Sequence, residues 1–149
     1  MELIVYDFDG VMTDNRFYVD QEGRESVQVN RADGLGVSEI KKLGIKQMIL
    51  STEKNPVVTS RAKKLGIACF QGVENKRDFL QSESKKMNID SHKIAYVGND
   101  INDLYAMQFC GIKLCPSDAH QEIIDISDFV LESKGGEGIA RELLDIISK

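Results

Sequence analysis

Six short apolar runs alternate with six helix-like segments along this chain, and this alternation constrains the fold more than any other feature. We predict strands at residues 3–8, 46–50, 67–70, 93–97, 111–115 and 128–131. We predict helices at residues 33–44, 55–66, 75–88, 102–111, 117–126 and 136–149. Strands and helices that alternate at this spacing form βαβ units. The expected fold class is therefore α/β, with helices on both faces of a parallel sheet.

A β-hairpin interrupts this alternation between the first predicted strand and the first predicted helix. Residues 16–30 read RFYVDQEGRESVQVN, which we interpret as two strands around a Gln21–Glu22–Gly23 turn. The sequence shows no internal repeat, low-complexity tract or linker. We therefore expect a single domain over residues 1–149, with the hairpin inserted after its first strand.

Composition and charge argue against several classes of protein. The net charge is −5 and the basic residues form no stripe, which is not typical of a nucleic-acid-binding protein. No apolar run approaches the roughly 18 residues of a membrane span, and residues 1–8 are too short and acidic for a signal peptide. We expect a cytoplasmic protein with no membrane or nucleic-acid partner. The three cysteines match no zinc or disulfide pattern, so we expect them to be buried hydrophobes.

Polar residues collect where the predicted strands end. In an open parallel sheet, ligands bind beyond the carboxyl ends of the strands, so residues that follow different strands meet at one edge. Four such groups converge here, after the first, second and fourth strands and at the start of the helix that follows the third. Their members are Asp7, Asp9, Ser51, Thr52, Glu53, Lys76, Asn99, Asp100 and Asp103.

The acidic members of this set predict a magnesium site. Carboxylates that gather at one point repel each other unless a hard cation lies between them, and Mg²⁺ prefers oxygen ligands that it shares with phosphate. The expected ligands are Asp7, Asp9, Asn99, Asp100 and Asp103.

The same residues predict phosphoryl transfer. A carboxylate beside Mg²⁺ can attack phosphorus, and we assign this role to Asp7, with an aspartyl-phosphate as the product. Asp9 has the spacing to protonate the leaving alcohol and then to deprotonate water. Ser51 and Lys76 are expected to hold the non-bridging oxygens as charge builds up. Taken alone, the Asp7-x-Asp9 pair is also compatible with a capped turn, so the prediction depends on the whole set.

These motifs resemble those of the haloacid dehalogenase-like phosphatases. The sequences DFDGV (7–11) and GNDIND (98–103), together with Ser51 and Lys76, match the four family motifs in order and nearly end to end. The resemblance implies a Rossmann-like core and Mg²⁺ as the cofactor.

Within that family the chain resembles the small branch without a cap domain, which acts on sugar-acid phosphates. This branch includes 3-deoxy-manno-octulosonate 8-phosphate phosphatases, nonulosonate 9-phosphate phosphatases, and phosphatase-like domains fused to acylneuraminate cytidylyltransferases. Local similarities lie in the hairpin and in NRADGLGV (30–37), QGVENK (71–76) and KGGEGIARE (134–142). The resemblance implies a homotetramer assembled through the hairpins, with a glycine-rich tail that reaches a neighbour's active site. A cytidylyltransferase of the same pathway is a further expected partner.

One position departs from the family pattern. The usual loop reads Gly-Asp-Asp, and its first Asp binds Mg²⁺, whereas Asn99 follows Gly98 here. An amide oxygen can still bind the ion, but the site loses one negative charge. We expect weaker metal binding unless Asp100 or Asp103 compensates.

Substrate contacts are the least constrained part of the prediction. The resemblance implies contacts from Glu53 and Lys64, and it extends to Arg61, although Arg61 and Lys64 also fit a solvated helix face. Asp33 fits a substrate contact or a helix N-cap equally well. The remaining candidates are Thr52, Gly135 and Gly136, and a flexible loop is the alternative for the glycines.

Two other functions use similar residues. A phospho-accepting receiver domain also needs an acidic pair, a Ser or Thr, a Lys and Mg²⁺, but its phosphorylated Asp follows the third strand. Residues 67–70 end without an Asp, which argues against a receiver. A weakly active assembly module attached to a cytidylyltransferase is the other alternative, and Asn99 is the best argument for it.

Glu53 bears on the choice of sugar acid. Octulosonate enzymes typically carry Arg at this position, where it can pair with a carboxylate. Glu53 repels a carboxylate and accepts hydrogen bonds from hydroxyls or an amide. A nonulosonate offers more such donors near its phosphate, and Lys64 could meet its distant carboxylate. We therefore expect a nonulosonate 9-phosphate, with 3-deoxy-manno-octulosonate 8-phosphate as the alternative.

Overall fold

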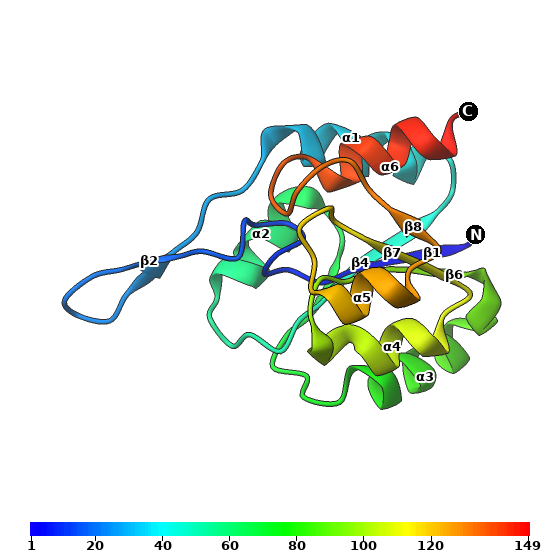
Figure 1. Ribbon diagram of the computed structural model, residues 1–149, viewed down its shortest axis with the longest axis horizontal. Helices are drawn as coiled ribbons and strands as arrows, with labels where there is room; N and C mark the ends of the chain where they lie inside the picture. The colour runs from blue at the N-terminus through cyan, green and yellow to red at the C-terminus, as the bar shows by residue number, and fades with distance from the viewer.

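The computed structural model describes residues 1–149 and contains one six-stranded parallel sheet (Figure 1). The strand order is β5–β4–β1–β6–β7–β8. The strands are β1 (Leu3–Tyr6), β4 (Lys46–Leu50), β5 (Ala68–Phe70), β6 (Ile94–Val97), β7 (Ile112–Cys115) and β8 (Phe129–Val130). Each lies within a predicted range, and the structure confirms the predicted α/β, Rossmann-like fold.

Six α-helices cover the two faces of this sheet. Helices α1, α2 and α6 pack on one face and α3, α4 and α5 on the other (Figure 1). The helices are α1 (Arg31–Lys42), α2 (Val57–Leu65), α3 (Lys76–Met87), α4 (Leu104–Phe109), α5 (Gln121–Ile126) and α6 (Ile139–Ile147). Short 3₁₀ turns precede β6 and α4, namely η1 (Ser91–Lys93) and η2 (Ile101–Asp103).

The six helix starts differ from the predicted ones by one to four residues, and two of them show the local reasons. Helix α1 begins two residues before the predicted start because Asn30 Oδ1 accepts a hydrogen bond from Ala32 N at 2.9 Å and caps it there. Helix α6 begins only at Ile139, since Gly136 and Gly138 adopt φ values of 77° and 95°, outside the right-handed helical region.

Burial on both faces explains why the central strands read as continuous apolar runs. Along β1, Ile4 and Tyr6 join the core beneath α1, α2 and α6, whereas Leu3 and Val5 join the core beneath α3, α4 and α5. All four are at most 1% exposed. A strand that is covered on both faces needs apolar residues at every position, which is typical of parallel sheets.

The predicted hairpin extends away from the sheet (Figure 1). Its strands β2 (Tyr18–Val19) and β3 (Glu25–Ser26) are antiparallel, and Asp20 Oδ1 accepts from Glu22 N and Arg24 N at the turn, both at 2.9 Å. No cap domain lies between β1 and α1. None of the helices is both long enough and apolar enough to cross a membrane.

The sheet order places the end of β1 at the point where the chain changes direction across the sheet. The chain adds β4 and β5 on one side of β1 and then returns to place β6, β7 and β8 on the other side. Such a switch point opens a crevice at the carboxyl ends of the flanking strands. Asp7 is the first residue beyond β1 and therefore lies at this crevice.

Candidate active site

A small polar cavity lies where β1, β4 and β6 end. Its volume is about 90 Å³, and none of its lining residues is hydrophobic. The residues that line it are Asp7, Asp9, Asn15, Ser51, Thr52, Asn99, Asp100 and Asn102. Six of these eight were predicted from the sequence as site residues, and they come from three different strand ends.

Asp7 and Lys76 form a buried ion pair beside this cavity. Asp7 N donates to Val97 O at 2.9 Å, which continues the sheet ladder one residue past β1 and fixes the direction of the side chain. Lys76 is the first residue of α3. Its Nζ lies 2.8 Å from Asp7 Oδ1, and the two side chains are only 1% and 6% exposed. The predicted nucleophile and the predicted phosphate-binding lysine are therefore in direct contact.

Asp103 supports the site from behind. Its Oδ1 accepts from Lys76 Nζ at 2.7 Å and from Tyr96 OH at 2.8 Å. Its Oδ2 accepts from the backbone N–H of Asn99 at 3.0 Å and of Asp100 at 3.4 Å. With both oxygens engaged in this way and none lining the cavity, Asp103 does not match the direct metal ligand that we expected from the sequence. It instead holds Lys76 and the 99–100 loop in place.

The side-chain amide of Asn99 lies against Asp7 Oδ2 and the Asp9 carbonyl oxygen, and with its Oδ1 on that side these groups form a three-oxygen set. As the side chain is oriented, Asn99 Oδ1 lies 2.9 Å from the Asp9 carbonyl oxygen and 3.1 Å from Asp7 Oδ2. Ligands about 2.1 Å from an octahedral Mg²⁺ are about 3.0 Å apart, so this spacing fits the ion. Turning the amide over would instead let Asn99 Nδ2 donate to both oxygens.

The metal set is thus mixed in character. No three His, Cys, Asp or Glu side chains group as a metal cage in this structure. Carboxylate, amide and backbone carbonyl oxygens together make the candidate site, with Asp9 contributing its carbonyl. The close approach requires a glycine next to Asp9: a Cβ on Gly10, whose φ is 83°, would lie 2.0 Å from Asn99 Nδ2.

Burial and charge act in opposite directions on the Asp7–Lys76 pair. Burial and the neighbouring charge of Asp103 raise the pKa of Asp7, whereas Lys76 opposes that shift. Burial by itself would lower the pKa of Lys76, but the charges of Asp7 and Asp103 raise it. Lys76 therefore stays a cation, and the two carboxylates give the buried cluster a net negative charge that favours a bound cation.

Asp9 has the environment of a proton donor. Burial is the main cause that raises its pKa, and the charge of Glu53, with a smaller effect from Glu25, adds to the shift. A carboxyl with a raised pKa retains its proton closer to neutral pH, which suits a general acid. Ser51 also lines the cavity, is 1% exposed, and its Oγ accepts from Glu53 N at 3.1 Å.

A wider groove lies outside the cavity, between β3 and the start of α2. Its volume is about 750 Å³, and Arg61, Lys64 and Arg24 supply positive charge along it. Arg61 Nη2 donates to Asn30 O at 2.7 Å, so Arg61 is partly held by the backbone. Glu25 also lines the groove, and its charge contributes to the raised pKa of Asp9.

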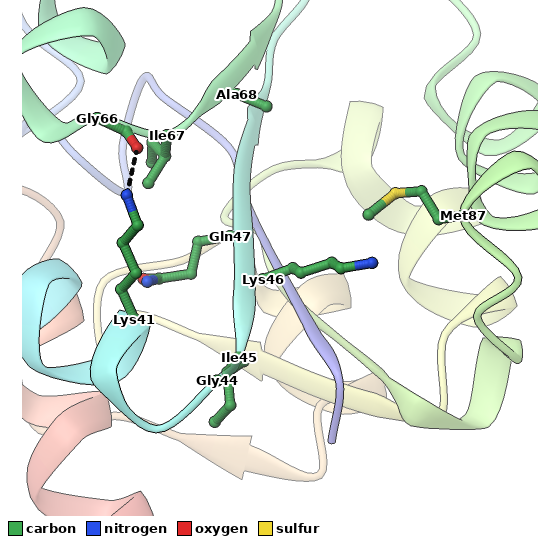
Figure 2. A pocket seen from close by; sticks show the side chains of 9 residues that line it. All are labelled: Lys41, Gly44, Ile45, Lys46, Gln47, Gly66, Ile67, Ala68 and Met87. Carbon is green, nitrogen blue, oxygen red and sulfur yellow. Dashed lines mark hydrogen bonds between the residues drawn. The ribbon is translucent and has the colours of Figure 1, made fainter.

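A separate cavity of about 350 Å³ lies at the opposite edge of the sheet, by the first residues of β4 and β5 (Figure 2). Lys46 and Ala68 are among its lining residues, and Lys41 Nζ donates to Gly66 O at 3.5 Å. None of its lining residues is an Asp, Glu, Ser, Thr, Cys or His. The larger cavity is therefore not the reactive one.

Comparison with known proteins agrees with this geometry. The family model described as haloacid dehalogenase-like hydrolase matches residues 38–143. The chain belongs to this family. The curated 3-deoxy-D-manno-octulosonate 8-phosphate phosphatase of Salmonella typhi is 32% identical over 148 residues, which cover 99% of this chain and 79% of that protein.

Solved structures of family members superpose closely. A haloacid dehalogenase family hydrolase from Streptomyces avermitilis has a TM-score of 0.94 and 39% identity, covering 96% of this chain and 82% of that one. A Moraxella catarrhalis 3-deoxy-D-manno-octulosonate 8-phosphate phosphatase, solved with magnesium, phosphate and its octulosonate, has a TM-score of 0.94 and 31% identity. It covers 99% of this chain and 85% of its own. These relatives confirm the predicted enzyme class, a phosphatase, and the predicted Mg²⁺ cofactor.

Asp33 does not line the acidic cavity that contains Asp7 and Asp9. It is fully buried, and its Oδ1 accepts from Ala140 N at 2.8 Å, so it caps the start of α6. The capping alternative fits, although the capped helix is α6 and not Asp33's own helix α1. The sequence does not reveal this because α1 and α6 are far apart along the chain.

Within its own chain the glycine-rich segment packs beside the loop that follows β1, and its predicted reach to a neighbour's active site stays a prediction. Gly135 and Gly136 pack against residues 10–14 of the same chain, where Gly136 N donates to Val11 O at 3.0 Å. They line another cavity, with Asp14 and Arg31, and not the acidic one. Within one chain they support the loop that carries Asp9 and do not reach into the cavity as substrate contacts.

Sequence reasoning missed three polar residues of the site. Asn15 and Asn102 line the cavity, and Tyr96 binds Asp103 behind it. Asn15 has a φ of 66°, a conformation that Asn tolerates better than most residues, and this preference in a loop after Asp9 was an available signal. Tyr96 offered no such signal in the sequence, because a tyrosine within a buried strand is expected to be an ordinary core residue.

Proposed function

We propose that this chain is a Mg²⁺-dependent phosphatase that hydrolyses a sugar-acid phosphate through an aspartyl-phosphate on Asp7. The contact between Lys76 and Asp7, next to the three-oxygen set, carries the proposal. Asp7 Oδ2, the Asp9 carbonyl and Asn99 Oδ1 would hold the ion, and Asp100 lies near enough on the cavity wall to contribute. Bound there, Mg²⁺ would neutralise phosphate charge and align the phosphoryl group with Asp7.

The chain's own residues then perform two transfers. In the first, an Asp7 carboxylate oxygen forms a bond to phosphorus, the ester P–O bond breaks, and Asp9 gives its proton to the leaving sugar oxygen. In the second, Asp9 takes a proton from water, which attacks the phosphorus and releases inorganic phosphate and free Asp7. Lys76 has a third N–H beyond the two that bind Asp7 and Asp103, and this N–H would bind a phosphoryl oxygen placed beside Asp7.

We assign 3-deoxy-manno-octulosonate 8-phosphate as the first candidate substrate. The support is the group of curated relatives from Salmonella, Escherichia coli and Haemophilus, all of which carry this activity in their names, at 30–32% identity over 99% of this chain. The outer groove supplies the cations Arg61 and Lys64 that a carboxylate would need.

Glu53 favours a second candidate, a nonulosonate 9-phosphate. Its Oε1 accepts from Lys54 N at 2.6 Å and from Asn55 N at 2.8 Å, which holds the carboxylate at the mouth of the site. It is near enough to Asp9 to raise that residue's pKa. A carboxylate at this point repels the acid group of a short substrate, whereas hydroxyls or an amide of a longer one would donate to it.

Assembly into a homotetramer through the hairpins remains part of the proposal. Phe17, Tyr18 and Val19 are 55%, 79% and 62% exposed on an element that leaves the body of the chain. Apolar side chains grouped in this way are typical of a surface that another protein covers. Sedimentation of the wild type and of Tyr18→Asp would test it, since loss of the tetramer in the variant is the expected result. Association with a cytidylyltransferase also stays a prediction.

Phosphate release from both candidate substrates, with Mg²⁺ and with EDTA, tests the proposed function. We expect turnover of one sugar-acid phosphate that EDTA abolishes and a higher kcat/KM for the eight-carbon substrate. Turnover of neither would favour the assembly-module alternative. Stable labelling of Asp7 by a small phosphodonor without release of phosphate would favour a receiver.

A further inference from the structure

Tyr96 is a buried polar group that the two transfers do not use. It lies in β6 beside Val5 of β1, is 0% exposed, and does not line the acidic cavity. Its hydroxyl donates to Asp103 Oδ1 at 2.8 Å. A phenol buried among apolar side chains requires such a partner, but the partner here belongs to the active site.

Asp103 Oδ1 accepts hydrogen bonds from two side chains that belong to different secondary-structure elements. Tyr96 reaches it from the central strand, and Lys76 Nζ reaches it from the first turn of α3 at 2.7 Å. Lys76 spans the gap from there to Asp7 Oδ1 at 2.8 Å. The phenol therefore occupies the one remaining acceptor position of the oxygen that anchors Lys76.

We propose that Tyr96 is a positioning residue for phosphoryl transfer, and that it acts through Asp103 on Lys76. With the hydroxyl in place, Asp103 Oδ1 has a fixed direction and offers Lys76 a single acceptor site. Lys76 is then held toward Asp7, with its third N–H aimed at the phosphoryl oxygens. This inference rests on the proposed function for its kinetic consequence, but its geometric consequence is independent of it.

Without the hydroxyl, Asp103 Oδ1 loses one of its two donors and attracts the Lys76 ammonium more strongly. The ammonium would then move toward Asp103 and away from Asp7. The contact at risk is the one that serves the transition state and not the one that binds the sugar, so kcat should change more than KM.

Tyr6 provides a matched control within the same sheet. It too is 0% exposed on a central strand, and its hydroxyl makes one hydrogen bond, to Gln47 Oε1 at 3.0 Å. Its side chain packs in the core beneath α1, α2 and α6, whereas Tyr96 packs beneath α3, α4 and α5. Tyr6→Phe and Tyr96→Phe therefore each remove one buried phenol hydrogen bond, the first to a neutral amide and the second to a carboxylate, and only the second leads to Lys76.

The experiment compares steady-state kinetics and thermal unfolding of the wild type, Tyr96→Phe and Tyr6→Phe, with saturating Mg²⁺. We expect Tm to decrease in both variants, and more in Tyr96→Phe, because its lost hydrogen bond is to a charged group. For Tyr96→Phe we expect kcat to fall about ten-fold with KM within about two-fold, because a hydrogen bond to a charged group is lost. Tyr6→Phe should keep its kcat. Equal kcat values for the two variants, or a change confined to KM, would overturn the inference.

A crystal structure of Tyr96→Phe gives a readout that needs no activity. We expect the separation of Lys76 Nζ from Asp7 Oδ1 to lengthen, with Lys76 nearer Asp103. An unchanged position of Lys76 would refute the inference even if kcat fell. If the wild type released no phosphate, the proposed function would fail, while this structure would still decide whether Tyr96 positions Lys76.

Discussion

Lys76 Nζ donates to Asp7 Oδ1 over 2.8 Å, and almost no part of either side chain contacts solvent. Asp103 shares the same ammonium, so two carboxylates and one cation form a buried cluster with a net negative charge. In such surroundings the ionised form of Asp7 is unfavourable, as its raised pKa shows. A divalent cation beside Asp7 would remove this imbalance, which gives a physical reason for the metal requirement.

Replacing the nucleophile should abolish turnover without loss of the fold. Asp7→Asn keeps the shape of the side chain but removes the oxygen that attacks phosphorus, and Asp103 still compensates Lys76. We expect phosphate release below a few per cent of the wild-type rate, with an unchanged far-UV circular dichroism spectrum. Turnover above that level in the variant would mean that Asp7 is not the nucleophile.

A carboxylate at position 99 should tighten metal binding. Asn99→Asp adds one formal charge where the side-chain amide lies against Asp7 Oδ2 and the Asp9 carbonyl. We expect the Mg²⁺ concentration for half-maximal activity to fall on the order of ten-fold. Asn102→Asp is the control, because it adds the same charge on the wall of the same cavity. An equal effect of both variants would indicate that the added negative charge attracts Mg²⁺ through general electrostatics, without direct coordination by residue 99.

Glu53 should act as a selector between substrates. Glu53→Arg reverses the charge at the mouth of the site and should raise kcat/KM for the octulosonate relative to a nonulosonate by about ten-fold or more, since one good hydrogen bond is exchanged. Glu53→Gln retains an acceptor for Lys54 N and Asn55 N and controls for the loop that Glu53 caps. A ratio that does not move in Glu53→Arg would exclude this role.

The glycine-rich segment should control the loop that carries Asp9. A Cβ on Gly135 would lie 2.2 Å from Gly10 O, so Gly135→Ala must displace either segment. We expect a loss of about 1–3 kcal/mol in the free energy of unfolding and a higher Mg²⁺ requirement. At Gly34 in α1 a Cβ meets nothing within 4 Å. Gly34→Ala should therefore stabilise the chain by about 0.5–1 kcal/mol. Normal Mg²⁺ dependence in Gly135→Ala would contradict this coupling.

Asp33 should make stability depend on pH. Burial raises its pKa to about 6, although the Ala140 N–H and Arg61 oppose the shift. Since the folded state binds this proton more tightly than the unfolded state, the stabilisation is fully present below about pH 4 and is lost as pH rises through 6. The free energy of unfolding of wild type relative to Asp33→Asn should fall by at most about 3 kcal/mol over this range. Urea titrations at several pH values measure it, and a pH-independent difference would contradict it.

The order of the strands and helices could be predicted from the sequence because it depends on local signals. Apolar runs bounded by polar residues located all six strands of the sheet, and the hairpin at residues 16–30 followed from its turn. Helix ends were less certain, since they depend on single contacts such as the cap from Asn30 to Ala32 N. The hydrophobic pattern that predicts a helix is averaged over many residues, so a single capping contact hardly changes it.

The sequence by itself also determined that the strand ends of Asp7, Ser51 and Asn99 would meet, because parallel strands expose their carboxyl ends at one edge. Only the tertiary structure decided which atoms meet there. It turned Asp103 toward Lys76 and Tyr96, brought the carbonyl of Asp9 against the Asn99 amide, and placed Asp33 at the start of α6. Side-chain direction depends on packing between elements far apart in sequence, and no local pattern encodes that packing.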